Sequence, residues 1–118
     1  MTKSSSDEIV VLCGGVGAAK LLAGLVRVTE PAAISAVVNI ADDETIHGLH
    51  ISPDLDTIAY TLAGEINPET GWGLIGESWN AMEMVSKYGG IDWFKLGDRD
   101  IGTHLYRTQR FSEGAQLH

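Results

Sequence analysis

The first forty residues alternate between short apolar runs and one helical period. Residues 9–12 and 34–38 are short, predominantly apolar runs, which are typical of strands buried on both faces of a parallel sheet. Between them, residues 18–28 place apolar side chains at the spacing of an amphipathic helix, and Pro31 ends that segment. This order predicts a β-turn-α-β unit with a right-handed crossover.

Three further helices are predicted in the rest of the chain. Residues 52–53 are Ser-Pro, a helix-start signal because serine caps a helix and proline suits its first turn, and this helix ends at Gly64. A second helical period covers residues 77–88 and ends at paired glycines. Residues 97–100 are expected to form a polar turn, and residues 101–111 the last helix.

The pattern predicts an α/β protein that is Rossmann-like, with three layers and a mainly parallel sheet. Only two strands are predicted, whereas sheets usually have about four to six, so the fold is expected to be truncated. Residues 1–8 are polar and are predicted to be a disordered tail. Residues 9–118 are expected to form the N-terminal part of one Rossmann-like domain.

Composition narrows the classes of function. Sixteen acidic residues against eight basic ones give a net charge of -8, which disfavours a nucleic-acid partner because such a surface needs a basic stripe. No apolar run approaches the roughly 18 residues of a membrane span, and no signal peptide is recognised at the start. With one cysteine no intrachain disulfide can form, so a reducing, cytoplasmic location is expected.

The turn between the first strand and helix is rich in glycine. It comprises Gly14, Gly15, Val16 and Gly17, with Lys20 one turn further on. Backbone amides at such a strand-to-helix turn can face an anion, which predicts phosphate binding here, with Lys20 adding a point charge. The turn matches neither the dinucleotide fingerprint nor the P-loop. The alternative is that the glycines only make a tight connection and that Lys20 extends into solvent.

Carboxylates follow the second predicted strand. Asp42 and Asp43 come shortly after residue 38, and Asp54 and Asp56 lie at the start of the next helix. Hard oxygen ligands of this kind suit Mg²⁺, so Asp42, Asp54 and Asp43 are the predicted metal ligands. An acid near this point could instead hold a ribose hydroxyl, or the segment could be a solvated acidic loop. Asp56 points away from Asp54 on a helix and can equally be a cap or dipole partner.

Histidines and a late charged cluster complete the candidate residues. His47 and His50 are expected on a loop, where His50 is assigned to ligand contact, although a loop histidine is more often a hydrogen-bonding element. No zinc motif is present. Asp98, Arg99 and His104 are the predicted catalytic group. Thr103, His104 and Arg107 share one face of the predicted last helix, which would suit an anionic substrate; the alternative is an ordinary surface Asp–Arg pair.

Taken together, these motifs resemble the CofD/FbiA family, the 2-phospho-L-lactate or phosphoenolpyruvate transferases of coenzyme F-420 biosynthesis. The resemblance covers the chain from Ile9 to Thr108, and its most specific blocks are residues 48–57 (Gly-Leu-His-Ile-Ser-Pro-Asp-Leu-Asp-Thr) and 96–100 (Leu-Gly-Asp-Arg-Asp). Cys13, Ala18 and Ala41 depart from the usual family residues. Family members are longer, so the resemblance implies the N-terminal portion of a transferase domain.

The resemblance implies a reaction. A phospholactyl or phosphoenolpyruvyl group moves from a guanosine-diphospho-linked donor to the ribityl hydroxyl of the deazaflavin Fo, releasing GMP, with Mg²⁺ held by Asp42 and Asp54. It also implies a homodimer at full length. The alternative is a non-catalytic nucleotide or nucleotide-sugar binder of the gluconeogenesis-factor type, which begins with a similar glycine turn.

Overall fold

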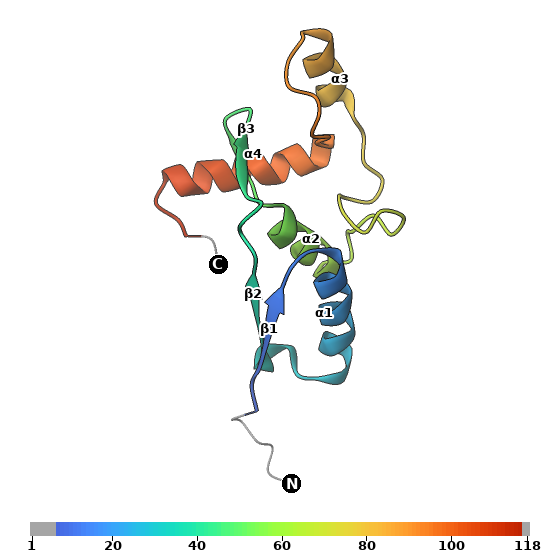
Figure 1. The fold of residues 1–118 in the computed structure, drawn as a ribbon, viewed down its shortest axis with the longest axis vertical. Coiled ribbons are helices and arrows are strands. Elements are labelled where there is room, and N and C mark those ends of the chain that lie inside the picture. Colours follow the sequence, from blue (N-terminus) through green and yellow to red (C-terminus); the bar gives the residue numbers. More distant parts are fainter. Residues whose placement is uncertain (1–6, 117–118) are drawn as a thin grey trace.

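The computed structural model describes residues 7–116. Most of the predicted N-terminal tail therefore lies outside the described residues, and residues 7–8 have no regular structure. In chain order the elements are β1 (Ile9–Cys13), α1 (Val16–Val28), the short 3₁₀ helix η1 (Pro31–Ala33), β2 (Ile34–Val38), β3 (Glu44–Ile46), β4 (Leu49–Ile51), α2 (Pro53–Leu62), α3 (Asn80–Lys87) and α4 (Asp98–Ser112) (Figure 1).

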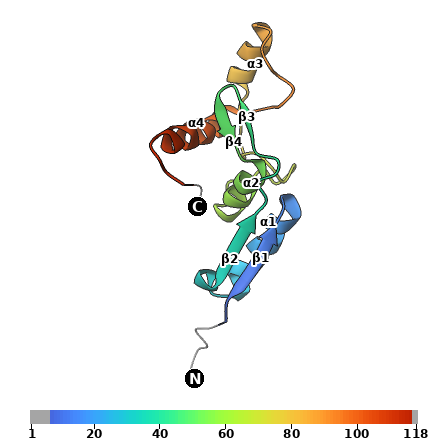
Figure 2. The same cartoon turned by 60° about the vertical axis from the view of Figure 1, so that its left-hand side comes forward.

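The predicted β-α-β unit is confirmed. Strands β1 and β2 pair in parallel, from Ile9 opposite Ile34 to Cys13 opposite Val38, and α1 connects them (Figure 2). Helices α1 and α2 cover one face of this pair around the buried side chains of Cys13, Leu22 and Ile58. The chain is therefore an α/β protein with a parallel sheet, consistent with a truncated Rossmann-like domain.

The expectation that both faces of these strands are buried is wrong for the described residues. Val10, Leu12 and Val37 point away from α1 and are 62%, 81% and 55% exposed. Side chains alternate between the two faces of a strand, so covering one face leaves every second residue in solvent. An apolar run therefore predicted the strands but did not show how many layers the described part contains.

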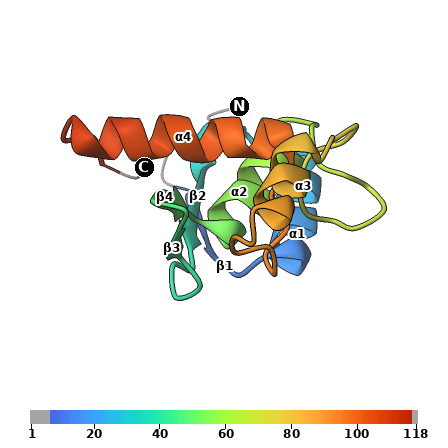
Figure 3. The same ribbon diagram turned by 90° about the horizontal axis from the view of Figure 1, so that it is seen from above.

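A second core lies beyond the carboxyl ends of β1 and β2. Strands β3 and β4 form an antiparallel hairpin, and its buried residues Ile46 and Ile51 pack with Met82 and Leu96. Seen from above, α4 spans the molecule alongside β4, α2 and α3 (Figure 3). Strand β4 contributes Ile51 to this second core, and α2, which follows it directly, contributes Ile58 to the first core, so these two elements connect the cores.

The loop predicted around His47 and His50 is a β-hairpin in the structure. His47 and Gly48 form its tip with φ values of 56° and 73°, and positive φ at both central residues matches the right-handed twist of the flanking strands. His50 lies within β4. The pattern missed the hairpin because each strand has only three residues, too few for a period-2 signal.

Helices α3 and α4 begin elsewhere than predicted, because Asp98, the first residue of α4, caps α3, and Glu77, which lies just before α3, caps α4. Asp98 accepts hydrogen bonds from the amides of Asn80 and Ala81 at 3.1 and 2.8 Å, so α3 begins at Asn80 rather than at Glu77. Glu77 accepts the amides of Arg99 and Asp100 at 2.9 and 3.0 Å. The polar turn predicted over residues 97–100 is consequently the first turn of α4.

The Glu77 cap requires glycine at position 97. A Cβ at Gly97 would lie 2.0 Å from Glu77 Cγ, which is a steric clash. Replacing Glu77 with alanine is expected to lower the free energy of unfolding by about 1–2 kcal/mol, since two amides of α4 lose their acceptor. Urea denaturation followed by circular dichroism measures this loss.

A matched control for the cap is Glu83→Ala. Glu83 pairs with Lys87 in an exposed i,i+4 contact, which is worth about 0.5 kcal/mol or less. Equal losses for the two alanine variants would contradict the capping role of Glu77.

Candidate functional site

The glycine turn lies at the carboxyl end of β1, directly against the first turn of α2. A Cβ at Gly15 would lie only 3.0 Å from Asp54 Oδ1. The Asp54 carboxylate therefore lies close to the backbone of the turn, in space that a side chain at position 15 would crowd. Asn39, which follows β2, donates its side-chain amide to Asp54 Oδ2 at 3.0 Å. Its backbone amide bonds the carbonyl of Cys13 at 2.8 Å. The ends of both parallel strands and the start of α2 therefore meet here, the usual ligand position in open α/β sheets.

The start of α1 offers backbone donors at this point. Gly15 is the N-cap of the helix, and no side chain caps it. The first amides of a helix have no partner within the helix, and the helix dipole makes this end positive. Anion binding by the turn comprising Gly14, Gly15, Val16 and Gly17 stays a prediction, with which these uncapped amides are compatible. Lys20 is exposed one turn further along α1, and its contribution to anion binding remains a prediction.

A phosphate at this turn would lie close to the Asp54 carboxylate. Two anions at such a distance repel unless a cation lies between them. Mg²⁺ commonly takes one or two carboxylates together with substrate phosphate oxygens and water. The donor types at the turn therefore fit Mg²⁺, and Asp54 would be its protein ligand there; that binding remains a prediction.

The other two predicted metal ligands lie on the approach to the hairpin. Asp43 Oδ2 accepts the hydroxyl of Ser52 at 2.9 Å and lies 3.3 Å from His50 Nε2, whereas Asp42 is exposed in the turn after β2. Within residues 7–116, the ligand atoms of Asp42, Asp43 and Asp54 do not form a group within 4.8 Å. Their joint binding of Mg²⁺ remains a prediction.

His50 contacts α4 through both its ring and its backbone. The ring stacks edge-on against Phe111 with centroids 4.8 Å apart, and the backbone amide bonds Thr108 Oγ1 at 2.8 Å. The half-buried His50 thus joins β4 to α4, and Asp43 beside it faces the start of α2. Contact of His50 with a ligand remains a prediction.

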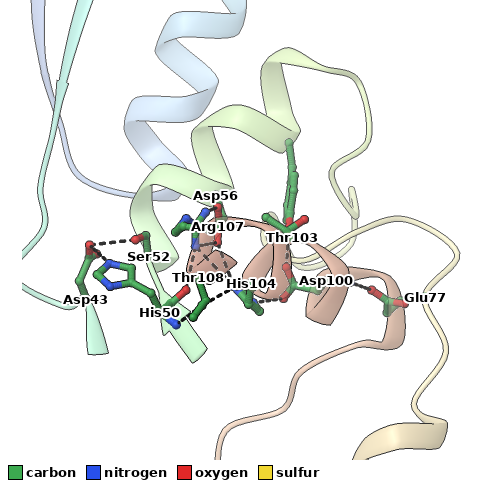
Figure 4. Close-up of polar contacts among 11 residues, drawn as sticks. Asp43, His50, Ser52, Asp56, Glu77, Asp100, Thr103, His104, Arg107 and Thr108 are labelled. Carbon is green, nitrogen blue, oxygen red and sulfur yellow. Dashed lines mark hydrogen bonds and ion pairs between the residues drawn. The ribbon is translucent and has the colours of Figure 1, made fainter. Parts of the chain in front are cut away.

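A buried charged network, which sequence reasoning did not assemble, connects α2 to α4 (Figure 4). Asp56 and His104 are 6% and 1% exposed. Arg107 donates hydrogen bonds to both carboxylate oxygens of Asp56, one of them at 3.2 Å. It also donates to the carbonyl of His50 at 3.2 Å. On the other side, His104 Nε2 lies 3.3 Å from Asp100 Oδ2. Because 51 residues separate Asp56 from Arg107, their pairing carried no local sequence signal.

The groups around His104 favour one tautomer of its neutral ring. Arg107 can only donate, and its Nη1 lies 3.4 Å from His104 Nδ1, so a neutral ring would carry its proton on Nε2, which lies 3.3 Å from Asp100 Oδ2. Nε2 nevertheless has no partner in hydrogen-bond geometry. The Tyr60 hydroxyl donates to Asp100 Oδ1 at 2.5 Å.

Burial and hydrogen bonding act in opposite directions on the pKa values of Asp56 and Asp100. Burial raises the pKa of Asp56, and the Arg107 guanidinium opposes this shift. Burial also acts to raise the pKa of Asp100, but the neighbouring His104 ring and the hydrogen bond from Tyr60 outweigh it, so that this pKa is lowered. The pKa of Tyr60 is raised by burial and by its bond to Asp100. Both carboxylates thus interact with positive or donating groups inside the protein.

Asp56, Asp100 and His104 also satisfy the distance criterion for a metal site. One ligand atom from each lies within 4.8 Å of the others, and among residues 7–116 no other such group is found. Arg107 already neutralises Asp56 at this point. The arrangement is therefore that of a buried ion-pair network, and the predicted Mg²⁺ position at the glycine turn is separate from it.

Asp98 and Arg99 form hydrogen bonds with the loop before α3. Besides capping α3, Asp98 accepts the Ser78 hydroxyl at 2.7 Å, and its pKa is lowered, chiefly by the backbone bond from Ala81. Arg99 donates to the carbonyl of Ile75 at 2.8 Å. These contacts occupy both side chains, and the catalytic role expected for Asp98, Arg99 and His104 remains a prediction.

Fold and site together define an α/β protein with a glycine-rich strand-to-helix turn and an acidic residue, Asp54, at the carboxyl ends of its parallel strands. The chain belongs to the CofD family: the family model described as 2-phospho-L-lactate transferase CofD matches residues 9–118. No described helix combines the length and apolar character needed to cross a membrane.

Relatives with curated names agree with this family. A phosphoenolpyruvate transferase of Nocardia farcinica is 50% identical over 115 residues, which are 97% of this chain and 35% of the relative. Phosphoenolpyruvate transferases of Mycobacterium bovis and Mycobacterium avium are 47% and 45% identical over 93% of the chain. The chain thus spans 35 to 39% of the length of these relatives.

Proposed function

We propose that this chain contributes the phosphate- and Mg²⁺-binding part of a cytoplasmic phosphoenolpyruvyl or phospholactyl transferase. The donor is guanosine-diphospho-linked, the acceptor is the deazaflavin Fo, and GMP is released in coenzyme F-420 biosynthesis. The full-length enzyme is a homodimer. The observation that carries the proposal is the approach of Asp54 to Gly15, which joins a carboxylate to an anion-binding turn. The relatives are phosphoenolpyruvate transferases by name, which favours phosphoenolpyruvate as the transferred acid.

The proposed chemistry is a displacement at phosphorus. The acceptor hydroxyl loses its proton to solvent as its oxygen forms a bond to the phosphorus that carries the enolpyruvyl group. The bond from that phosphorus to the bridging oxygen breaks, and GMP leaves with the electron pair. When bound, Mg²⁺ supplies positive charge for the phosphoryl oxygens. The amides at the start of α1 orient the diphosphate. Asp54 would hold the metal ion, and Asn39 orients the Asp54 carboxylate through its 3.0 Å hydrogen bond.

Product formation tests this proposal. The chain, and a chimera in which residues 9–116 replace the matching part of the Nocardia farcinica relative, are incubated with Fo, Mg²⁺ and the enolpyruvyl-diphosphoguanosine donor. We expect the chimera to form GMP and an Fo derivative heavier by the phosphoenolpyruvyl group, both detected by mass spectrometry. Reactions lacking donor or Mg²⁺ are the controls. A folded chimera that forms neither product would contradict the proposal.

A second candidate is binding of a nucleotide or nucleotide sugar without turnover. The glycine turn, Asn39 and Asp54 are all present in this chain, although it spans only 35% of the length of the Nocardia farcinica relative. Binding at the turn therefore needs fewer residues than the whole transfer reaction, which favours this candidate. Calorimetric titration of the chain separates the two functions. Binding of a uridine diphosphate sugar without binding of Fo would favour this second candidate.

A further inference from the structure

Ser52 is the N-cap residue of α2, but its hydroxyl does not cap that helix. A serine at this position normally accepts a hydrogen bond from an amide of the first helical turn. No such bond is formed here, although Ser52 is fully buried. The hydroxyl instead donates to Asp43 Oδ2 at 2.9 Å (Figure 4). Because a buried hydroxyl is costly unless it is hydrogen-bonded, the side chain of Ser52 is committed to Asp43.

The bond from Ser52 to Asp43 has a counterpart in the opposite direction. Asn39, in the segment after β2, donates its side-chain amide to Asp54 Oδ2 at 3.0 Å. Ser52, at the start of α2, donates to Asp43, which follows β2. Each segment therefore supplies the donor that holds a carboxylate of the other. The two bonds place Asp43 and Asp54 at one junction, where β2 has ended and α2 begins.

The Asp43 carboxylate is held through one of its two oxygens. The ring Nε2 of His50 lies 3.3 Å from Oδ2, the same oxygen that accepts the Ser52 hydroxyl. The side chain of Asp43 is only 14% exposed, so these contacts fix its orientation. Within residues 7–116, both contacts go to Oδ2, which leaves Oδ1 for a further partner. Carboxylates that bind metal ions are commonly oriented by hydrogen bonds of this kind.

We propose that Ser52 is a positioning residue, which orients the Asp43 carboxylate so that Asp43 and Asp54 can bind one Mg²⁺ ion. The inference rests on the proposed function and adds the residue that arranges its metal ligands. Ser52 acts through Asp43 and not on a substrate. Neither Ser52 nor Asp43 lines the cavity of about 370 Å³ that aromatic and charged side chains enclose beside α2.

Binding of Mn²⁺ to the 118-residue chain, followed by electron paramagnetic resonance without donor or acceptor, tests this role. We expect Ser52→Ala to weaken binding about tenfold, because loss of a partner that orients a metal ligand costs about 10–100-fold in affinity. Ser52→Thr keeps the hydroxyl and is expected to restore most of the affinity. Circular dichroism verifies that each variant is folded.

Ser86→Ala is the matched control. Ser86 also donates to an aspartate, Asp92 Oδ2, at 2.8 Å, but this bond lies on α3 and in the loop after it. Its removal is expected to leave Mn²⁺ affinity unchanged. Equal affinities of the folded Ser52→Ala and Ser86→Ala variants would overturn the positioning role.

A double variant separates positioning from a general structural effect. Asp43→Asn alone is expected to weaken Mn²⁺ binding at least as much as Ser52→Ala. Adding Ser52→Ala to Asp43→Asn should cause no further loss, because residues that act through one contact are not additive. Additive losses would show that Ser52 does not act through Asp43 and would overturn the inference.

The role of Ser52 and the proposed function can fail separately. Mn²⁺ binding that depends on Ser52, together with a folded chimera that forms no product in the transfer assay, would contradict the proposed function and support the role of Ser52. Product formation by the chimera, together with Mn²⁺ binding that is indifferent to Ser52→Ala, would support the function and overturn the role. Absence of Mn²⁺ binding by the folded chain would also overturn it.

Discussion

Replacing Asp54 with asparagine is expected to lower the rate of transfer by about a hundredfold at saturating Mg²⁺, because charge stabilisation by a metal contributes several kcal/mol to phosphoryl transfer. Asparagine has the size of aspartate and can keep a contact with Asn39, which now bonds Asp54 Oδ2. The lost property is the negative charge beside Gly15. Initial rates of the chimera over a Mg²⁺ titration measure the effect, which should appear as a lower maximal rate and a weaker Mg²⁺ response.

The matched control removes a carboxylate charge far from the turn. Glu113→Gln breaks only an exposed contact with Arg110, so its rate and Mg²⁺ response should equal those of the unchanged protein. If Asp54→Asn retains the original Mg²⁺ dependence, Asp54 is not a metal ligand. Asp42→Asn and Asp43→Asn, tested in the same titration, would then decide whether either carboxylate holds the ion.

Replacing Arg107 with methionine is expected to lower the free energy of unfolding by about 3–5 kcal/mol, the usual cost of leaving one partner of a buried ion pair without the other. The side chains of Asp56 and Arg107 are each 9% exposed, so water cannot compensate the remaining carboxylate. The carbonyl of His50 loses a donor as well. Urea denaturation of the chain near neutral pH measures the change.

The same substitution on the surface of the same helix is the control. Arg110 pairs with Glu113 while both side chains are about half exposed, at 51% and 49%, and Arg110→Met should change stability by no more than about 0.5 kcal/mol. Lower pH should reduce the deficit of Arg107→Met, because burial already raises the pKa of Asp56 and protonation removes the unpaired charge. Similar losses for both variants would show that the network contributes little.

Local patterns accounted for the first half of the fold. The apolar run at Ile9–Cys13, the glycine turn and the helical period after it are contiguous in sequence, so their chemistry is readable without knowing the rest of the chain. The start of α2 was equally local, since Ser52, Pro53 and Asp54 sit at adjacent positions. The proximity of Asp54 to Gly15 followed only in outline, from the rule that strand ends meet at one edge of a sheet.

Distant partners account for the boundaries that were predicted wrongly. Helix α3 starts at Asn80 because Asp98 caps it, and α4 starts at Asp98 because Glu77 caps it. Each capping residue lies about twenty positions from its helix in the sequence, so no short window contains both. A lone acid at position 77 or 98 therefore resembled a first-turn residue or a surface charge.

By itself, the sequence determined the β-α-β unit, the glycine turn and the acidic segment that follows, because each depends on spacing between neighbours along the chain. The tertiary structure alone decided that Asp54 contacts Gly15, that Asp56 pairs with Arg107, and that aromatic and charged residues enclose a cavity. Those contacts join segments up to 51 residues apart. Burial and pairing energies acting across such distances arise only when the elements pack together.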